Sequence, residues 1–217
     1  MAILHEKTPY EKINPFTGVW VRTRETVRYV IEEKPVSFAL LVIVLVSIVN
    51  SIAGSLDPQF TDTFSIVSTV LIGFIVGPIF GLIGVSILSA VYLLIGKLFK
   101  GKGTYLDIFK AVAVGLIPSL WFAPLLLIGY FVAPSAFDLT SDAEISVLNL
   151  IVSALVSIAG FIVAIWTMVI QSKAIGEAHQ FSSWKGFFTV LIPAVVGIVL
   201  LILLVIVVIA AFGAMLT

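Results

Sequence analysis

Cysteine is absent from this 217-residue chain, and charged residues make up only 11% of it. The lack of cysteine excludes disulfide bonds and thiolate chemistry. Two histidines occur, His5 and His179, and they do not form the pair of histidines by which one helix face binds zinc. The sequence also contains no nucleophile elbow and no Gly-x-x-x-x-Gly-Lys-Ser/Thr phosphate-binding loop. We therefore predict no catalytic residue, no metal site and no cofactor, and we expect a protein that is not an enzyme.

Hydrophobic residues, by contrast, make up 60% of the chain, whereas ordinary soluble domains contain about 45–50%. A chain of this length cannot bury so much apolar surface in water, because a small folded body leaves many of its residues exposed. This composition excludes a conventional soluble enzyme, a nucleic-acid-binding module and a secreted disulfide scaffold. We predict an all-α integral membrane protein that folds as a polytopic helical bundle.

Runs of about 20 apolar residues are long enough to cross the hydrocarbon core of a bilayer as helices. The first such run begins after Pro35, and others recur through the rest of the chain. Within them, Pro78, Pro118 and Pro193 are expected to break helices. We expect a membrane domain over residues 36–217 with five transmembrane helices, at about 36–56, 78–96, 112–131, 146–170 and 187–212.

The stretch from Phe64 to Ile95 is too long for one simple span and short for two spans joined by a turn. Gly77 and Pro78 lie in its middle, and two alternatives follow. Either two crossings meet at Gly77–Pro78, or residues 64–77 are half-inserted or interfacial and one full crossing follows from about Pro78.

Basic residues fall in three segments, namely the N-terminus, residues 97–110 and residues 173–185, and the other connections carry only acidic residues. Cytoplasmic loops are enriched in Lys and Arg. A single crossing between Asp62 and Lys97 places every basic residue on one side. The distribution therefore predicts five crossings, a cytoplasmic N-terminus and a C-terminus outside, in the plasma membrane if the source is prokaryotic.

The N-terminal segment, residues 1–35, contains a predicted amphipathic helix over residues 17–34. Apolar residues recur there at near-helical spacing, whereas Arg and Glu occupy the other faces. Such a helix lies in the headgroup region of a bilayer, with Trp20 and Tyr29 as interfacial anchors. The alternative is a solvated helix that leads through Pro35 into the first span.

Small residues recur every four positions between Ser65 and Gly81, including Gly73 and Gly77. Small residues let helix backbones approach closely in lipid, either within one subunit or across a homodimer interface. Asn50 is the deepest strongly polar residue of the spans apart from hydroxyls, and we expect it to form a hydrogen bond between helices.

Two helical hairpins of the sequence resemble each other. Ile117–Pro118 aligns with Ile192–Pro193 at an offset of 75 residues, and Lys110 then aligns with Lys185. An internal duplication, of the kind found in some transporters, explains this pattern. Similar solvation demands at two inner loops also explain it.

Several short strings occur in a particular order along the chain: Asn14-Pro15-Phe16, Val30-Ile31-Glu32-Glu33-Lys34-Pro35, Gly77-Pro78-Ile79, Lys100-Gly101-Lys102-Gly103-Thr104, and Ala174-Ile175-Gly176-Glu177-Ala178-His179-Gln180-Phe181-Ser182. In this order they resemble prokaryotic members of the Yip (Ypt/Rab-interacting-protein) domain family. The resemblance covers nearly the whole chain and implies a five-span helical domain with a cytoplasmic N-terminus. For eukaryotic members it implies vesicle trafficking and contact with small GTPases. The eukaryotic Asp-Leu-Tyr-Gly-Pro string is missing here, which argues against GTPase binding.

The leading hypothesis for function is a non-catalytic membrane protein that organises membrane or trafficking-type processes by binding a protein or lipid at its cytoplasmic face. Its expected partners are membrane lipid and another membrane protein or a second copy, and not nucleic acid. The candidate binding residues are basic or aromatic side chains expected on that face: Trp20, Arg22, Arg24, Arg28, Lys100, Lys102, Lys110, His179, Trp184 and Lys185.

Two other hypotheses remain. A permease or channel for a small solute would use the glycines and prolines of the spans to break helices around a cavity. An intramembrane enzyme that modifies lipid is less favoured, because no polar pocket for catalysis emerges from the sequence.

Overall fold

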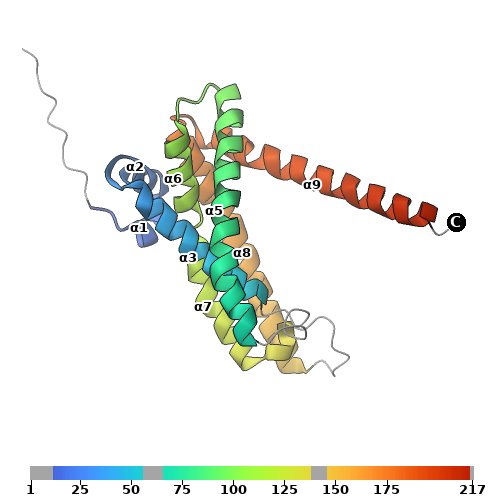
Figure 1. Ribbon diagram of the computed structural model, residues 1–217. Coiled ribbons are helices and arrows are strands. Elements are labelled where there is room, and N and C mark those ends of the chain that lie inside the picture. The colour runs from blue at the N-terminus through green and yellow to red at the C-terminus, as the bar shows by residue number, and fades with distance from the viewer. Residues whose placement is uncertain (1–11, 56–65, 138–145, 216–217) are drawn as a thin grey trace, which may run out of the picture.

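The computed structural model describes residues 12–55, 66–137 and 146–215, and within these residues every regular element is a helix. The expected all-α bundle is confirmed. In chain order (Figure 1), the elements are α1 (Pro15–Val21), α2 (Thr23–Glu33), α3 (Val36–Ser55), α5 (Ile66–Leu98), α6 (Tyr105–Gly115), α7 (Ile117–Val132), the 3-10 helix η1 (Pro134–Phe137), α8 (Val147–Ala178) and α9 (Ser183–Met215).

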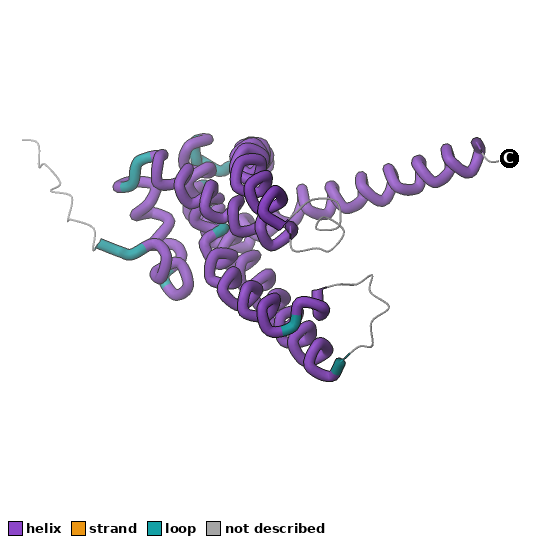
Figure 2. Tube along the Cα trace, turned by 60° about the horizontal axis from the view of Figure 1, so that its bottom comes forward, coloured by secondary structure: helices purple, strands orange, loops and turns teal. Residues whose placement is uncertain are grey.

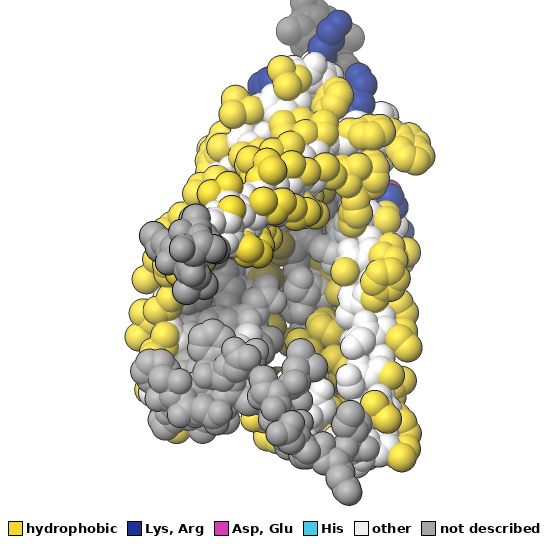
Figure 3. All heavy atoms as spheres, turned by 90° about the vertical axis from the view of Figure 1, so that its right-hand side faces the viewer, with side chains coloured by type: hydrophobic (Ala, Val, Ile, Leu, Met, Phe, Trp, Pro, Cys, Tyr) yellow, Lys and Arg dark blue, Asp and Glu magenta, His cyan; other side chains and the backbone are white. Residues whose placement is uncertain are grey.

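Four helical segments are long and apolar enough to cross a membrane: Val70–Leu98, Tyr105–Val132, Val147–Ala178 and Ser183–Ala210. A shorter apolar helix, Val36–Ile52, accompanies them. On the face drawn in Figure 3, large apolar side chains cover much of the surface that the described residues form, and Lys and Arg lie toward its top. Lipid solvates such a surface, whereas water does not. The chain is therefore a multi-pass helical membrane protein.

The helix break expected at Gly77–Pro78 is wrong, because α5 is one helix of 33 residues that passes through Pro78. Residues 66–77 are thus the first turns of that helix rather than a separate half-inserted segment, while residues 64 and 65 lie outside the described residues. A proline inside a membrane helix is tolerated where neighbouring helices satisfy the backbone groups it frees.

Glycines on α5 bring this helix close to α3. A Cβ added at Gly77 would lie 2.7 Å from Cβ of Ser51, and one added at Gly81 would overlap the side chain of Ser47. Gly73 is buried on the same helix. Asn50 differs from expectation, since its side chain is exposed on α3 and makes no hydrogen bond among the described residues.

The third expected span is two helices, α6 and α7, which meet at Leu116. Pro118 stands in the first turn of α7, where a backbone N–H is not needed. Pro118 therefore marks a break, whereas α9 passes through Pro193 without one. α6 begins seven residues earlier than expected, at Tyr105, because Thr104 and Asp107 form a capping box.

The predicted single amphipathic helix is also two helices, because α1 ends and α2 begins at Arg22. The apolar face of α2 packs on protein and is not left for lipid: Val27 and Val30 are buried against a core to which α6 and α8 contribute. The apolar face of α2 is therefore covered by other helices of the same chain. The physical reason is that α8 continues to Ala178, eight residues past its expected end, and offers α2 a protein surface.

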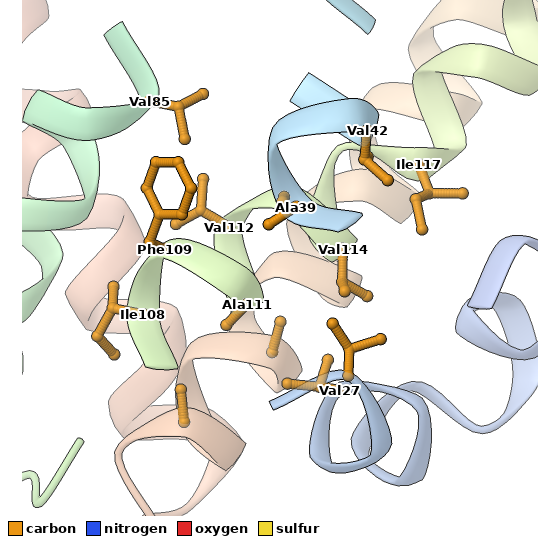
Figure 4. Packing of buried hydrophobic residues seen from close by; sticks show 14 of the residues in the cluster. Val27, Ala39, Val42, Val85, Ile108, Phe109, Ala111, Val112, Val114 and Ile117 are labelled. Carbon is orange, nitrogen blue, oxygen red and sulfur yellow. The ribbon is translucent and has the colours of Figure 1, made fainter. Parts of the chain in front are cut away.

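The buried core lies at one end of the bundle, at the top of Figure 1, where α2 and α6 meet the ends of α5 and α8. α6 is its centre, and every residue from Ile108 to Gly115 except Lys110 is buried. Val27 of α2, Val85 of α5 and Ala39 of α3 approach α6 from different sides (Figure 4). The far part of α9 extends alone, away from the other helices (Figure 2).

Candidate functional site at the basic end of the bundle

Two turns lie at the end of the bundle that contains the buried core, which we call the basic end. One turn joins α5 to α6, and the other joins α8 to α9. Lys100 and Gln180 occupy equivalent places in them, with positive φ angles of 63° and 57°. In each turn the next amide donates to the carbonyl five residues earlier, at 2.8 and 2.9 Å. This pattern is the Schellman motif, which satisfies the last carbonyls of a helix. The two turns share this backbone 80 positions apart, rather than at the offset of 75 suggested by the prolines.

His179 fills the α5–α6 turn. Its side chain is 1% exposed, and its Nε2 lies 3.2 Å from the carbonyl oxygen of Tyr92. The imidazole stacks on Phe181 with 5.1 Å between ring centroids. A Cβ added at either Gly96 or Gly101 would overlap the imidazole, so both positions need glycine for space. The buried imidazole of His179 thus fills the space inside the α5–α6 turn and packs the two turns together.

Burial lowers the pKa of His179 below its ordinary value of 6.5. The hydrogen bond to the carbonyl of Tyr92 and the charge of Asp107 oppose that shift, and the charge of Lys97 adds to it. A neutral ring that donates from Nε2 satisfies this bond. Nδ1 has no hydrogen-bond partner among the described residues.

Glu177 is the second link between distant elements. Its carboxylate accepts from Nη1 of Arg24 at 3.1 Å and from Nε of Arg28 at 2.7 Å. Nη2 of Arg24 also donates to the carbonyl of Phe181 at 2.9 Å and to the hydroxyl of Ser183 at 3.2 Å. The side chain of Glu177 is only 10% exposed, whereas those of Arg24 and Arg28 are 40% and 52% exposed. These contacts of Arg24 and Arg28 with Glu177, which we call the clamp, hold α2 against the α8–α9 turn.

Lys110, on α6, caps the C-terminal end of α2. Its Nζ donates to the carbonyl oxygens of Ile31 at 2.9 Å and Lys34 at 2.6 Å. Positive charge at a helix C-terminus satisfies the last carbonyls and the helix dipole. Lys110 therefore stabilises the end of α2 where the chain turns into α3.

The predicted binding residues separate into two groups. Arg24, Arg28, Lys110 and His179 are engaged by the intramolecular contacts just described. The others are the half-buried Trp20 and the exposed side chains of Arg22, Lys100, Lys102, Trp184 and Lys185. Arg22 pairs with Glu25 at 3.9 Å.

Sequence reasoning missed Glu177, which the structure places at the centre of the clamp. The available signal was an acidic residue within residues 173–185, whose other charged residues are basic. Its partners on α2 lie 153 and 149 positions away in the chain, so spacing alone does not connect them.

A pocket of about 670 Å³ opens beside the clamp. It lies between α2, the start of α6 and the α8–α9 turn. The residues that line it are Arg24, Arg28, Ile31, Glu32, Asp107, Glu177, Ala178, Gln180, Phe181 and Ser182. In the described part of the chain, Glu32 and Asp107 form no ion pair with a basic side chain. The same part contains no group of three or more His, Asp or Glu arranged to hold a metal ion.

The Yip1 domain model matches residues 17–215, which is nearly the whole chain. The chain belongs to the Yip1 domain family. The resemblance predicted from the short strings is confirmed, and the match runs through α1 and α2 as well as the long helices. Searches of curated proteins and of solved structures return no match to this chain.

Proposed function

We propose that this Yip1-family protein is a non-catalytic membrane protein that binds a partner, lipid or protein, at the basic end of its bundle. That end faces the cytoplasm, with the N-terminus on the same side and the C-terminus outside. Through this binding the protein organises membrane or trafficking-type processes.

The observation that carries the proposal is the clamp of Arg24 and Arg28 on Glu177. Three elements far apart in sequence meet there, and their contacts build a pocket with both signs of charge. Its volume of about 670 Å³ falls within the range of roughly 300–1,000 Å³ that is typical of ligand sites. Because ion pairs and the buried side chain of His179 hold the elements around the pocket in place, few side chains need to be ordered when a partner binds.

Photocrosslinking in native membranes tests the proposal. A photoreactive amino acid at Gln180, an exposed residue of the pocket, should give a discrete crosslinked product, either a protein or a lipid adduct. The matched control is the same group at Val21, which is 83% exposed on α1 and does not line the pocket. Equal crosslinking at the two positions would contradict binding at this end.

Sidedness is tested separately, and the absence of cysteine makes the test simple. Single cysteines replacing Lys102 and Thr217 are treated with a membrane-impermeant maleimide in intact cells. We expect labelling at position 217 only, and labelling at 102 only after the membrane is opened. Labelling of both positions in intact cells would contradict the proposed orientation.

A second candidate, a permease for a small solute, is favoured by one observation at the α6–α7 break. Gln171 is buried there on α8, against Gly115, and neither polar atom of its side chain has a partner among the described residues. Polar groups inside a span often mark a solute pathway. Solute flux into proteoliposomes that is reduced in Gln171→Leu would support this function, whereas flux equal to that of protein-free vesicles would reject it.

A further inference from the structure

We propose that an anionic phospholipid binds where α5 ends, with its phosphate at the lysines of the α5–α6 turn and an acyl chain along the exposed face of α5. This inference rests on the proposed function, because it names the class of lipid that is bound at the basic end.

Three lysines within six residues give the α5–α6 turn its charge. Lys97, Lys100 and Lys102 have exposed side chains, and none of them forms an ion pair within the described residues. No acidic residue occurs in the sequence between Lys97 and Asp107. The carboxylate of Asp107 accepts from the amide and hydroxyl of Thr104 at the start of α6, where the helix dipole compensates its charge. The three ammonium groups are therefore available to an anionic partner.

The backbone that carries these lysines is held in place by contacts within both turns. The amide of Gly101 donates to the carbonyl of Gly96 at 2.8 Å, and the amide of Lys102 donates to the carbonyl of His179 at 3.0 Å. A Cβ added at Gly103 would lie 2.5 Å from the carbonyl oxygen of Ala178. Because the backbone is fixed, only the lysine side chains need to be ordered when a ligand binds.

The exposed face of α5 carries a row of large apolar side chains that ends beside the lysines. Phe80, Ile87, Leu94 and Leu98 stand seven, seven and four residues apart, which places them on one face of the helix. Each of the four is more than half exposed, and Leu98, which follows Lys97 directly, is 81% exposed. An acyl chain that lies along this row brings its headgroup to the lysines of the turn.

The length of α5 places these lysines at the level of lipid headgroups. The candidate span Val70–Leu98 has 29 residues, which corresponds to about 42 Å at a rise of 1.5 Å per residue. A bilayer measures about 40–45 Å with its headgroup regions included. Anionic lipids of the cytoplasmic leaflet attract lysines near the membrane surface. An acidic protein would complement the lysines and leave the apolar row unused, so we favour a lipid.

Native mass spectrometry of the full chain in detergent measures this binding. The protein is mixed with phosphatidylglycerol or phosphatidylcholine of the same acyl chains, and retained lipid is counted. We expect phosphatidylglycerol to be retained about tenfold more, because phosphatidylcholine has no net charge. Soluble glycerol phosphate should not displace the lipid, because it lacks the acyl chain that contacts α5.

The decisive variant is Lys97→Gln/Lys100→Gln, and Lys12→Gln/Lys185→Gln is its matched control. Each double variant removes two exposed positive charges that form no ion pair in the part of the chain that the structure describes, and Lys12 and Lys185 lie outside the α5–α6 turn. We expect the preference for phosphatidylglycerol to fall about tenfold in the first and to change by less than about twofold in the second. Equal thermal unfolding midpoints of the two variants show that the comparison concerns binding.

Photocrosslinking from the lipid locates the site. A phosphatidylglycerol with a diazirine on one acyl chain is incorporated into nanodiscs that contain the full chain, and the adducts are mapped by mass spectrometry of peptides. We expect adducts to concentrate on residues 87–98 of α5 and to be depleted in Lys97→Gln/Lys100→Gln. Adducts spread evenly over all the exposed helices would overturn the inference.

Equal retention of the two lipids by the wild-type chain, equal losses in the two double variants, or displacement by glycerol phosphate would also overturn it. Crosslinking at Gln180 does not depend on these lysines. A discrete product at Gln180 together with equal retention of the two lipids would reject this inference and leave the proposed function standing. Equal crosslinking at Gln180 and Val21 would reject the proposed function, whichever lipid is retained.

Discussion

The α5–α6 turn and the α8–α9 turn end their helices with the same backbone motif and contribute opposite things to the basic end. The α5–α6 turn contributes space, since Gly96, Gly101 and Gly103 all lie against the other turn. The α8–α9 turn contributes side chains, with His179 filling that space and Glu177 binding α2. The same helix-ending motif therefore provides space for a side chain in the α5–α6 turn and provides the side chain that fills this space in the α8–α9 turn.

The backbone joins the two turns as well. The amide of Lys102 donates to the carbonyl of His179 at 3.0 Å. Because the turns interlock, a change in either one is expected to disturb the pocket that the α8–α9 turn helps to form. Equivalent positions of the two turns can therefore be substituted in pairs.

The largest effect is expected from the paired glycines Gly96 and Gly176, each five residues before the end of its turn motif. In Gly96→Ala the new methyl group overlaps His179, and we expect a loss of about 3 kcal/mol in the free energy of unfolding. In Gly176→Ala the nearest atom is the flexible Nη2 of Arg24 at 3.1 Å, so we expect a change within about 1 kcal/mol. Reversible unfolding in mixed micelles measures both. Similar losses in the free energy of unfolding for the two variants would show that the α5–α6 turn does not provide the space that His179 fills.

The next effect concerns Glu177 and Lys97, which both stand one residue before the last residue of their helices. Glu177→Gln leaves two guanidinium groups without their carboxylate. We expect a loss of about 2 kcal/mol, less than for a fully buried pair because the arginines are partly hydrated. Lys97→Gln should change stability by less than about 0.5 kcal/mol, since Lys97 is exposed. If Glu177→Gln lost as little stability as Lys97→Gln, the contacts of Glu177 with Arg24 and Arg28 would not stabilise this end of the protein.

A pH effect follows from His179. Its pKa is lowered by burial, so the folded chain binds the proton less readily than the unfolded chain. The contribution of neutral His179 is therefore complete above about pH 6.5 and is lost as the pH falls below that value, by at most about 1.4 kcal/mol per pH unit. Unfolding measured between pH 7.5 and 5.5 should show this slope, and His179→Gln should reduce it. An unchanged slope in that variant would assign the effect to other groups.

The smallest effect is expected at the positive-φ positions. Lys100→Gly and Gln180→Gly remove the strain of a side chain in the left-handed region, and each should raise the free energy of unfolding by up to about 1 kcal/mol. Here the two turns should respond alike, because they share the backbone and differ only in side chains. A gain in one turn and a loss in the other would contradict the shared motif.

Sequence patterns predicted what depends on local chemistry. The length of an apolar run placed α3 within one residue of its observed end. The outcome at the prolines was not predictable, because Pro78 and Pro193 lie inside continuous helices whereas Pro118 begins one. Whether neighbouring helices compensate a lost backbone hydrogen bond is a property of packing, not of the residue.

The site was predicted only in part for a related reason. Arg24, Arg28 and His179 were predicted to bind a lipid or protein partner, and the structure shows intramolecular contacts of these side chains that were not predicted. Glu177 lies about 150 positions from the two arginines, and the glycines around His179 come from another helix. Such contacts exist only after the chain has folded.

The central claim is that Glu177 holds α2 against the α8–α9 turn, and that this turn and the α5–α6 turn pack together around His179. Hydrogen–deuterium exchange of the full chain in lipid nanodiscs tests this most directly. We predict that amides of Thr23–Glu33 and of residues 176–181 exchange slowly in the wild type and that both accelerate in Glu177→Gln, while α3 is unchanged. Acceleration of neither segment, or rapid exchange of α2 already in the wild type, would contradict the account.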